Sequence, residues 1–152
     1  LLRLSFEDVD VLARFKGCGA AGGIGYGLSL PFSVSLVSGF DLISKWFDLP
    51  NLVENADVVL TGEGRFDKTS LSGKGPFELL RLADKKLKSS ILLAGSIEFD
   101  AVKDVCKGFH HCELLQFGKN EWSLERNLSL AEERFLDTLN AFSFENMNDH
   151  AL

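Results

Sequence analysis

The chain has 152 residues, about the length of one ordinary domain, and its 45% hydrophobic and 25% charged residues are typical of a packed protein rather than a disordered one. A formal net charge of −6 argues against nucleic-acid or membrane-surface partners, because both kinds of binding need a surplus of lysine and arginine. No apolar run approaches the roughly 20 residues that span a bilayer, and three cysteines fit neither a disulfide framework nor a zinc site. We expect a cytoplasmic protein that holds any anionic ligand with local groups.

The first elements surround a glycine-rich run. Residues 6–15 alternate loosely between apolar and charged types and fit either a helix or a strand. The run from Gly17 to Gly27 carries no large side chain until Ile24, so its backbone can turn tightly and approach a ligand. We predict that a helix begins within this run and ends before Pro31, and that a short half-buried strand or extended segment follows at residues 32–36.

The middle of the chain predicts a strand followed by a long loop. A helix is expected from Asp41 to about Leu49, where Pro50 breaks it, and a short turn at residues 52–55. The apolar, β-branched residues 58–60 are typical of a buried strand in a parallel sheet. Residues 62–75 then form the longest polar, glycine-rich stretch, and long ordered loops in compact domains are usually functional.

The second half alternates helices and strands. The patterns predict a helix at 76–87, a strand at 91–95, a helix at 98–107, a strand at 111–117 and a helix at 123–142 with Ser123 as its cap. Trp46, Trp122 and most phenylalanines are expected in the core. The order indicates an α/β layered domain with a mostly parallel sheet flanked by helices. Ligands of such sheets bind beyond the carboxyl ends of the strands, which is where the loop after Leu60 begins.

The glycine-rich run has three interpretations. Gly17, Gly19 and Gly22 satisfy the G-x-G-x-x-G pattern of dinucleotide-binding proteins, with Asp41 near the expected position of the acidic residue. A second interpretation is a turn with a purely structural role. A third interpretation, which we favour, is an anion-binding turn at a helix N-terminus, where exposed N–H groups and the helix dipole act together.

The loop after Leu60 carries the residue types of phosphoryl transfer. Glu63, Arg65 and Asp67 alternate along it, and Lys74 follows Gly73. The Gly73-Lys74 pair is not a P-loop, because Lys68 stands where that motif needs its first glycine. Phosphoryl transfer needs a proton acceptor, a carboxylate for Mg²⁺ and cations for the phosphoryl oxygens.

Two interpretations of this loop remain open. In the first, Asp67 or Glu63 is the metal ligand or the base, and Arg65 with Lys74 binds the transferring phosphoryl group. In the second, Arg65 bridges the two carboxylates and only holds the loop in shape. The hydroxyl groups of Thr69, Ser70 and Ser72 either bind substrate or cap the next helix.

Taken in order, these motifs resemble the type I glycerate kinase family. The resemblance is carried by the turn at residues 17–25, the segment Asp57–Asp67, the Gly73-Lys74 pair, the strand ending in Ala94-Gly95 and the Ser-Leu-Glu opening of the last helix. It implies a two-domain α/β architecture with the active site between domains, and phosphorylation of D-glycerate to 2-phosphoglycerate with ATP and Mg²⁺. The substrate- and phosphate-binding residues that it implies are Gly17, Gly19, Gly22, Gly23, Thr61, Gly62, Gly64, Ser70 and Gly73.

The same resemblance implies that this chain is one part of such an enzyme. Family members are considerably longer, and this chain begins at Leu1 rather than at methionine. We expect residues 1–38 to end the second, inserted domain, residues 39–145 to be the C-terminal part of the α/β domain, and residues 146–152 to be a tail. The expected partner is the missing N-terminal half or a second copy, and the chain alone is expected to be inactive.

The chain departs from the family pattern at three positions, and a second function class remains open. Lys16 replaces the usual proline, Cys18 a serine or alanine, and Thr69 a common glutamine whose amide would reach further. The alternative function is a free-standing, non-catalytic α/β module that binds a nucleotide or another anion. A dehydrogenase-type domain is a third possibility and would require nicotinamide binding.

Overall fold

The computed structural model describes residues 19–32 and 35–143 of the chain. The chain divides into two compact units, Leu1–Trp46 and Phe47–Leu152, and each is described here by itself. The predicted binding residue Gly17 and the segment 6–15 lie outside the described residues. No helix in the described ranges has the length and the apolar character needed to cross a membrane.

The described part of the first unit contains the end of the glycine-rich run and three short helices: η1 (Ala20–Gly23), α2 (Ile24–Ser29) and α3 (Gly39–Trp46). Ala21, Gly22 and Gly23 have φ angles of 50°, 71° and 83°, so the chain turns tightly through the left-handed region before α2 begins. That region disfavours residues with a side chain, which explains why glycine dominates the run. The prediction of a helix that begins in this run and ends before Pro31 is confirmed.

In the first unit, the strand alternative for residues 32–36 and the core position of Trp46 are wrong. Residues 35–38 have no regular secondary structure, and Phe32 and Leu36 are 63% and 40% exposed, so the half-buried strand is absent from the described part of this segment. No neighbouring strand is described in this unit that could pair with it. Trp46, expected in the core, is 68% exposed at the end of α3.

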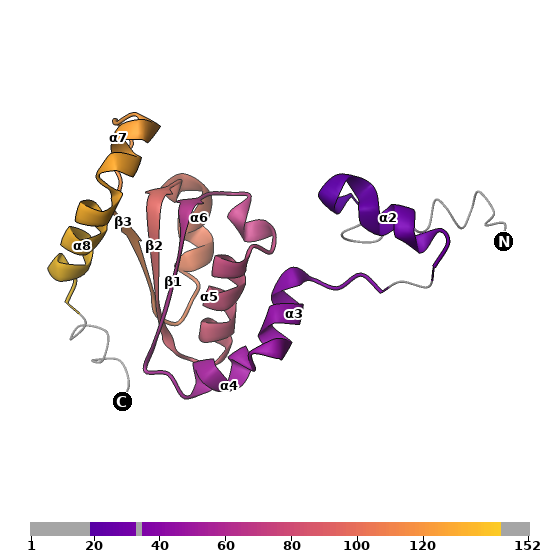
Figure 1. Cartoon of the computed structure of the whole chain (residues 1–152). Helices are drawn as coiled ribbons and strands as arrows, with labels where there is room; N and C mark the ends of the chain where they lie inside the picture. The colour runs from indigo at the N-terminus through magenta and orange to yellow at the C-terminus, as the bar shows by residue number, and fades with distance from the viewer. Residues whose placement is uncertain (1–18, 33–34, 144–152) are drawn as a thin grey trace. The chain divides into compact units, whose positions relative to one another are not determined.

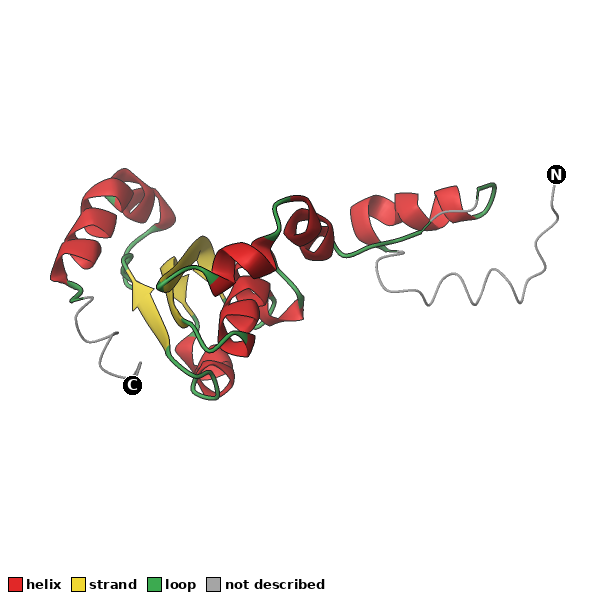
Figure 2. Cartoon of the chain, turned by 90° about the horizontal axis from the view of Figure 1, so that it is seen from below, coloured by secondary structure: helices red, strands yellow, loops and turns green. Residues whose placement is uncertain are grey.

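The second unit confirms the predicted α/β class. Its three-stranded parallel sheet has the order β1-β2-β3, and the strands lie between helices (Figures 1 and 2). The strands are β1 (Val58–Phe66), β2 (Ser89–Ile97) and β3 (Cys112–Gln116). The helices are α4 (Leu49–Glu54), η2 (Ser70–Ser72), α5 (Gly75–Lys85), α6 (Phe99–Cys106), α7 (Leu124–Ser129) and α8 (Ala131–Ala141).

The central strand β2 places apolar side chains on both faces of the sheet. Leu92 packs in a cluster with Leu80 of α5 and Val102 of α6. Its neighbours Ile91 and Leu93 pack on the opposite face with residues of α8. Successive strand residues point to opposite faces, and a parallel sheet is stable when helices cover both of them. The continuous apolar run of β2 therefore follows from its position in the fold.

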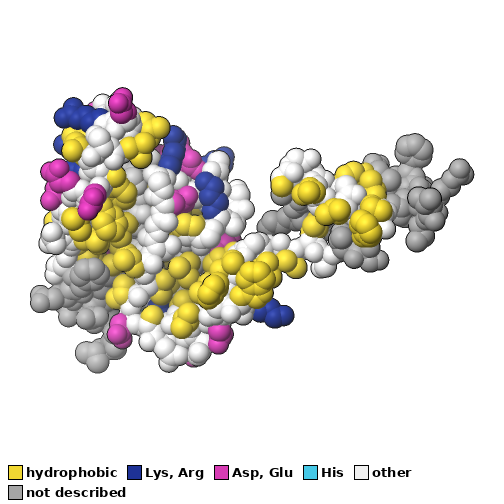
Figure 3. Space-filling model, in the orientation of Figure 1, with side chains coloured by type: hydrophobic (Ala, Val, Ile, Leu, Met, Phe, Trp, Pro, Cys, Tyr) yellow, Lys and Arg dark blue, Asp and Glu magenta, His cyan; other side chains and the backbone are white. Residues whose placement is uncertain are grey.

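Strand β1 forms an edge of the described sheet. Among the described residues it pairs only with β2, in a parallel register that runs from Val58 opposite Ser89 to Phe66 opposite Ile97. Leu60 is 50% exposed and lines an apolar cavity of about 410 Å³ with Leu93 and two phenylalanines. Hydrophobic side chains are visible on the face of the molecule drawn in Figure 3. Part of the apolar surface of this unit therefore remains accessible.

The largest differences between predicted and observed boundaries concern β1, α4 and the last predicted helix. Strand β1 continues to Phe66, so residues 62–66 of the predicted loop are strand, and the actual connection to α5 is residues 67–74. Pro50 lies in the first turn of α4, where its fixed φ favours the helix, and the break comes at Asp48, whose φ is 49°. The predicted helix at 123–142 is divided at Leu130 into α7 and α8.

Candidate active site

The four predicted catalytic residues lie together at the carboxyl end of β1. Glu63 and Arg65 belong to the strand, Asp67 follows it directly, and Lys74 immediately precedes α5. The Arg65 Nε atom lies 3.2 Å from Asp67 Oδ2, and the Lys74 Nζ atom lies 3.8 Å from Glu63 Oε2. The cluster therefore contains two ion pairs, whereas one sequence interpretation had Arg65 bridging both carboxylates.

Asp67 organises the turn between β1 and α5. Its Oδ1 atom accepts hydrogen bonds from the Thr69 backbone N–H at 2.8 Å and from the Thr69 hydroxyl at 2.6 Å. Ser70 is fully buried, and its Oγ atom accepts from the Asp67 backbone N–H at 3.2 Å. The Thr69 hydroxyl is the main group that lowers the pKa of Asp67, helped by the Thr69 backbone N–H, Lys74 and Ser70 and opposed by burial.

Replacing Thr69 by valine is expected to raise the pKa of Asp67 toward its ordinary value. A carboxyl group with a depressed pKa contributes stability above its unfolded pKa, and that stability is lost as the pH falls through the folded pKa. In the Thr69→Val variant this loss should be smaller and should be complete at a higher pH, because the strongest donor to the ionised form is gone. NMR titration of side-chain carboxyl carbons measures the change directly.

Asp100 supplies an internal reference for this titration. Its pKa is also lowered, by the Lys103 ammonium group on α6, and Thr69 has no part in that shift. We therefore expect the Asp100 titration to be identical in the two proteins. An unchanged Asp67 titration in the variant would show that the Thr69 hydroxyl does not stabilise the ionised carboxylate.

Glu63 has an available carboxylate oxygen. Its side chain is 17% exposed, and its Oε1 atom is buried without a hydrogen-bond partner among the described residues. Lys74 Nζ also donates a hydrogen bond of 3.4 Å to Ser70 Oγ, so the ammonium group lies between the strand and the turn. Both oxygens of Asp67, in contrast, are already engaged by Thr69 and Arg65.

The predicted binding glycines have different structural requirements. Gly62 runs so close to β2 that a Cβ atom there would lie 2.4 Å from the Leu93 carbonyl oxygen, whereas Gly64 has open space at the same place. Gly73 has a φ of 100° at the end of η2, a conformation that favours glycine. Thr61 pairs in register with Leu92 inside the sheet. The predicted binding residues Gly19, Gly22 and Gly23 belong to the first unit and are described with it.

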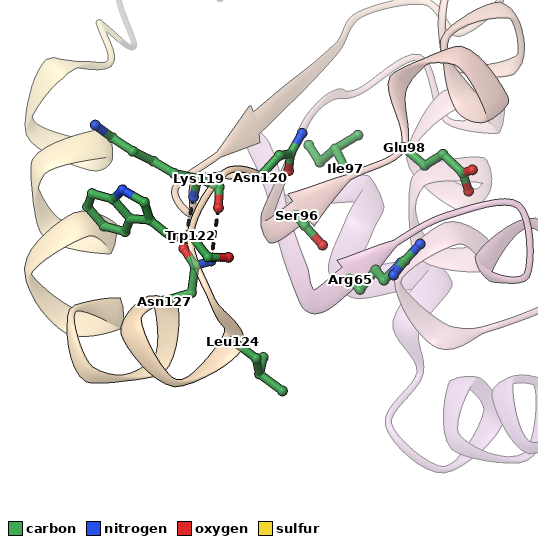
Figure 4. Close-up of a pocket in the computed structure, with 9 residues that line it drawn as sticks. All are labelled: Arg65, Ser96, Ile97, Glu98, Lys119, Asn120, Trp122, Leu124 and Asn127. Atoms are coloured by element: carbon green, nitrogen blue, oxygen red, sulfur yellow. Dashed lines mark hydrogen bonds between the residues drawn. The ribbon is translucent and has the colours of Figure 1, made fainter.

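A cavity of about 410 Å³ next to this cluster was not predicted from the sequence. Its lining includes Arg65 of β1, Ser96 of β2, Asn120 and Trp122 between β3 and α7, and Leu124 at the start of α7 (Figure 4). It lies beyond the carboxyl ends of all three strands, the usual ligand position in parallel sheets. A volume of this size is within the range of small-molecule sites.

Asn127 holds the loop that forms one wall of this cavity. Its Oδ1 atom accepts from the Lys119 backbone N–H at 2.9 Å, and its Nδ2 atom donates to the Lys119 carbonyl at 2.9 Å (Figure 4). The same amino group donates to the carbonyls of Trp122 and Ser123, both at 3.3 Å. Two cations also lie over the Trp122 ring, with Lys119 Nζ 4.8 Å and Arg126 Cζ 4.3 Å from its centre.

Replacing Asn127 by alanine is expected to lower the free energy of unfolding by about 2 kcal/mol, because several backbone groups of the loop lose their partner at once. Urea unfolding measures the loss, and the native emission of Trp122 should shift toward that of a solvated indole. Asn140→Ala is the matched control, since Asn140 is an exposed residue of α8. Equal stability of the two variants would contradict the role given to Asn127.

Comparison with known proteins relates these features to one family. Residues 3–142 match the family model of the glycerate kinase family. The chain is 43% identical over 90 residues to a glycerate kinase of Haemophilus influenzae, an alignment that covers 58% of this chain and 24% of that protein. It is 37% identical over 86 residues to a glycerate kinase of Bacillus subtilis, covering 57% of this chain and 22% of the relative. These alignments span about a quarter of the length of the curated relatives.

A solved structure agrees with the sequence relatives. The fold is similar to a crystal structure from Salmonella typhimurium LT2, of a protein provisionally described as glycerate kinase 2, with a TM-score of 0.54 and 28% sequence identity. The similarity covers 89% of this chain and 36% of that one. With a family model that matches nearly its whole length and a solved relative of the same fold, the chain belongs to the glycerate kinase family.

Proposed function

We propose that this chain forms one wall of the active site of a kinase that transfers the γ-phosphoryl group of ATP to D-glycerate. The observation that carries the proposal is the cluster at the end of β1, where two carboxylates, two cations and a fully buried hydroxyl group lie within one ion-pair and hydrogen-bond network. Membership of the glycerate kinase family supports the substrate. The remaining length that the relatives possess, or a second copy of this chain, would supply the opposite wall.

Lys74 and Arg65 are the proposed phosphoryl-binding cations. Lys74 directly precedes α5, whose 11 residues bring the positive end of a helix dipole to the same place. Arg65 is 68% exposed and pairs with Asp67 through Nε, so the other nitrogens of its guanidinium group can bind phosphoryl oxygens. The first-turn N–H groups of α5 at Gly75 and Phe77, which follow Ser70 and Gly73 in the chain, would add neutral donors.

Glu63 is the better placed carboxylate for Mg²⁺ or for the substrate proton. Its Oε1 atom is buried and lacks a hydrogen-bond partner within the described residues, which fits a group that a cation or a hydroxyl would complete. Bound Mg²⁺ would neutralise charge on the phosphoryl oxygens during transfer. Asp67 would then hold Arg65 and the turn in position through its hydrogen bonds.

In the proposed reaction the D-glycerate hydroxyl attacks the γ-phosphorus of ATP. The bond to the bridging oxygen breaks and ADP leaves, while the hydroxyl proton passes to a carboxylate of the cluster. The glycine-rich turn with Gly17, Gly19, Gly22 and Gly23, and the segment Thr61, Gly62 and Gly64, are proposed to contact substrate or phosphate. Residues 1–38 are proposed as the end of the second domain, residues 39–145 as the α/β domain and 146–152 as a tail.

A cytoplasmic location completes the proposal. Two of the three cysteines, Cys106 and Cys112, are free thiols in the structure, a state that a reducing compartment maintains.

Two measurements test this function. Isothermal calorimetry of the full chain with ATP and Mg²⁺ should show binding. Mixing the chain with the remaining segment of the Haemophilus influenzae relative, supplied as a second polypeptide, should produce phosphoglycerate from D-glycerate in an ATP-dependent assay. Binding of nucleotide without turnover in a folded, assembled mixture would favour the alternative, a non-catalytic nucleotide-binding module. Absence of both would refute the proposal.

A further inference from the structure

We infer that the cavity beyond β1, β2 and β3 binds the carboxylate-bearing phosphoryl acceptor, a small hydroxy acid, and that Asn120 helps to select it. The inference rests on the proposed function, because it places the acceptor next to the phosphoryl-transfer cluster. Arg65 belongs to both places: its Nε atom pairs with Asp67, and its side chain lines the cavity. An acceptor held there would lie beside the group to be transferred.

The cavity offers donors suited to a carboxylate. The terminal nitrogens of Arg65 and the hydroxyl group of Ser96 have no hydrogen-bond partner among the described residues, and Ser96 lies between Arg65 and Asn120 in Figure 4. A guanidinium group combined with neutral donors is a common way to bind a carboxylate, because charge-assisted hydrogen bonds are the strong ones. The cavity therefore has donors from two different strands.

The orientation of the Asn120 amide is determined by the backbone. The Ile97 N–H donates a hydrogen bond of 2.8 Å to the Gln116 side chain, and only the amide oxygen can accept it. The Gln116 amino group must then be the donor to the Gly118 carbonyl at 3.0 Å and to Asn120 Oδ1 at 3.1 Å. Since the oxygen of Asn120 is occupied, the group that Asn120 can offer to a ligand is its amino group.

Glu98 supplies a complementary acceptor. It follows β2 directly, lines the cavity, and forms no side-chain ion pair or hydrogen bond with any described residue. Its carboxylate lies on the same side of the cavity as Arg65 in Figure 4. A ligand with a carboxylate at one end and hydroxyl groups at the other would match these donors and this acceptor, whereas a polyol without a carboxylate would leave the donors unused.

Trp122 allows a direct test on the full chain. The protein contains two tryptophans, and Trp46 belongs to the first unit, so Trp46→Phe leaves Trp122, which lines the cavity, as the only indole. We expect millimolar D-glycerate to change the emission of this variant in a saturable way. Glycerol, which has the same carbon skeleton with a hydroxymethyl group in place of the carboxylate, should produce no saturable change.

The role of Asn120 in selecting the ligand is tested by an isosteric substitution in the Trp46→Phe protein. Asn120→Asp still accepts from Gln116 but replaces the amino donor by a negative charge, so affinity for D-glycerate should fall about tenfold or more. Asn140→Asp makes the identical chemical change on the exposed surface of α8 and should leave the affinity unchanged. Circular dichroism establishes that both variants are folded.

Three results would overturn the inference. One is the lack of any saturable response to D-glycerate while ATP and Mg²⁺ still bind in calorimetry, which leaves the proposed function intact. Another is a Trp122 response to ATP and Mg²⁺ alone that Asn120→Asp weakens, because the cavity would then hold the nucleotide. The third is equal weakening by Asn120→Asp and Asn140→Asp. Failure of both ligands to bind would refute the proposed function as well.

Discussion

Replacement of Gly62 by alanine is expected to destabilise the second unit by roughly 3 kcal/mol, a large part of the 5–15 kcal/mol that holds a typical domain together. The new Cβ atom would lie 2.4 Å from the Leu93 carbonyl oxygen, which is backbone of the central strand. To relieve the contact, β1 must move away from β2 and weaken the hydrogen-bonded ladder between them. Chemical denaturation followed by circular dichroism measures the loss.

Gly64 provides the matched control for this substitution. It lies two residues further along the same strand, has no atom within 4 Å of an added Cβ, and does not adopt a positive φ. Gly64→Ala should therefore change the free energy of unfolding by less than about 1 kcal/mol. If both variants are equally stable, the close approach of Gly62 to β2 does not limit the sheet.

Replacement of Lys74 by methionine is expected to weaken binding of ATP and Mg²⁺ by about tenfold or more, because the phosphate groups lose a charged hydrogen-bond donor. The effect on stability should be small, since Lys74 is 46% exposed and its nitrogen lies 3.8 Å from Glu63. Calorimetry and thermal unfolding of the same samples separate the two effects.

Lys85→Met is the control for the loss of one positive charge from α5. Lys85 is an exposed residue at the opposite end of that helix. Nucleotide affinity should stay at the wild-type value in this variant. A similar loss of affinity in both lysine variants would mean that net charge rather than a specific contact governs binding, and it would remove Lys74 from the proposed site.

The apolar patterns predicted where the strands of the sheet lie better than they predicted how long the strands are. Residues 58–60 and 91–95 are continuous apolar runs and were correctly assigned as strands. The remainder of β1 alternates glycine with charged residues, a composition typical of a loop. Its pairing with β2 up to Phe66 opposite Ile97 depends on tertiary contacts, which local propensity does not report.

The candidate site was predictable only where its residues are close in sequence. Glu63, Arg65 and Asp67 alternate along one segment, so their spacing suggested a common location, and the structure places them with Lys74. The cavity takes its lining from Arg65, Ser96 and Asn120, which are separated by tens of residues. Only the general rule that ligands bind at the carboxyl ends of parallel strands could have suggested it.

The division of the last predicted helix also has a local cause. A single amphipathic pattern covers 123–142, yet the chain bends at Leu130, where φ is −110° and ψ is 8°. The Ser129 hydroxyl donates to the Arg126 carbonyl at 3.0 Å, and such side-chain bonds compete with the helix backbone. Beyond the bend, Phe135 and Leu139 of α8 pack on the sheet. Before it, Asn127 of α7 forms hydrogen bonds with the loop at Lys119 that lines the cavity.

The open edge of β1 affects how the isolated chain behaves in solution. This strand is nine residues long, is paired on one side within the described sheet, and bears the half-exposed Leu60. It can therefore pair with a strand of another molecule. Two chains that meet along this edge would gain backbone hydrogen bonds and cover apolar surface in one step. Preparations of the chain should therefore aggregate more as their concentration rises. The substitution Leu60→Lys would be the simplest way to keep the chains monomeric, because it places a charge on this edge.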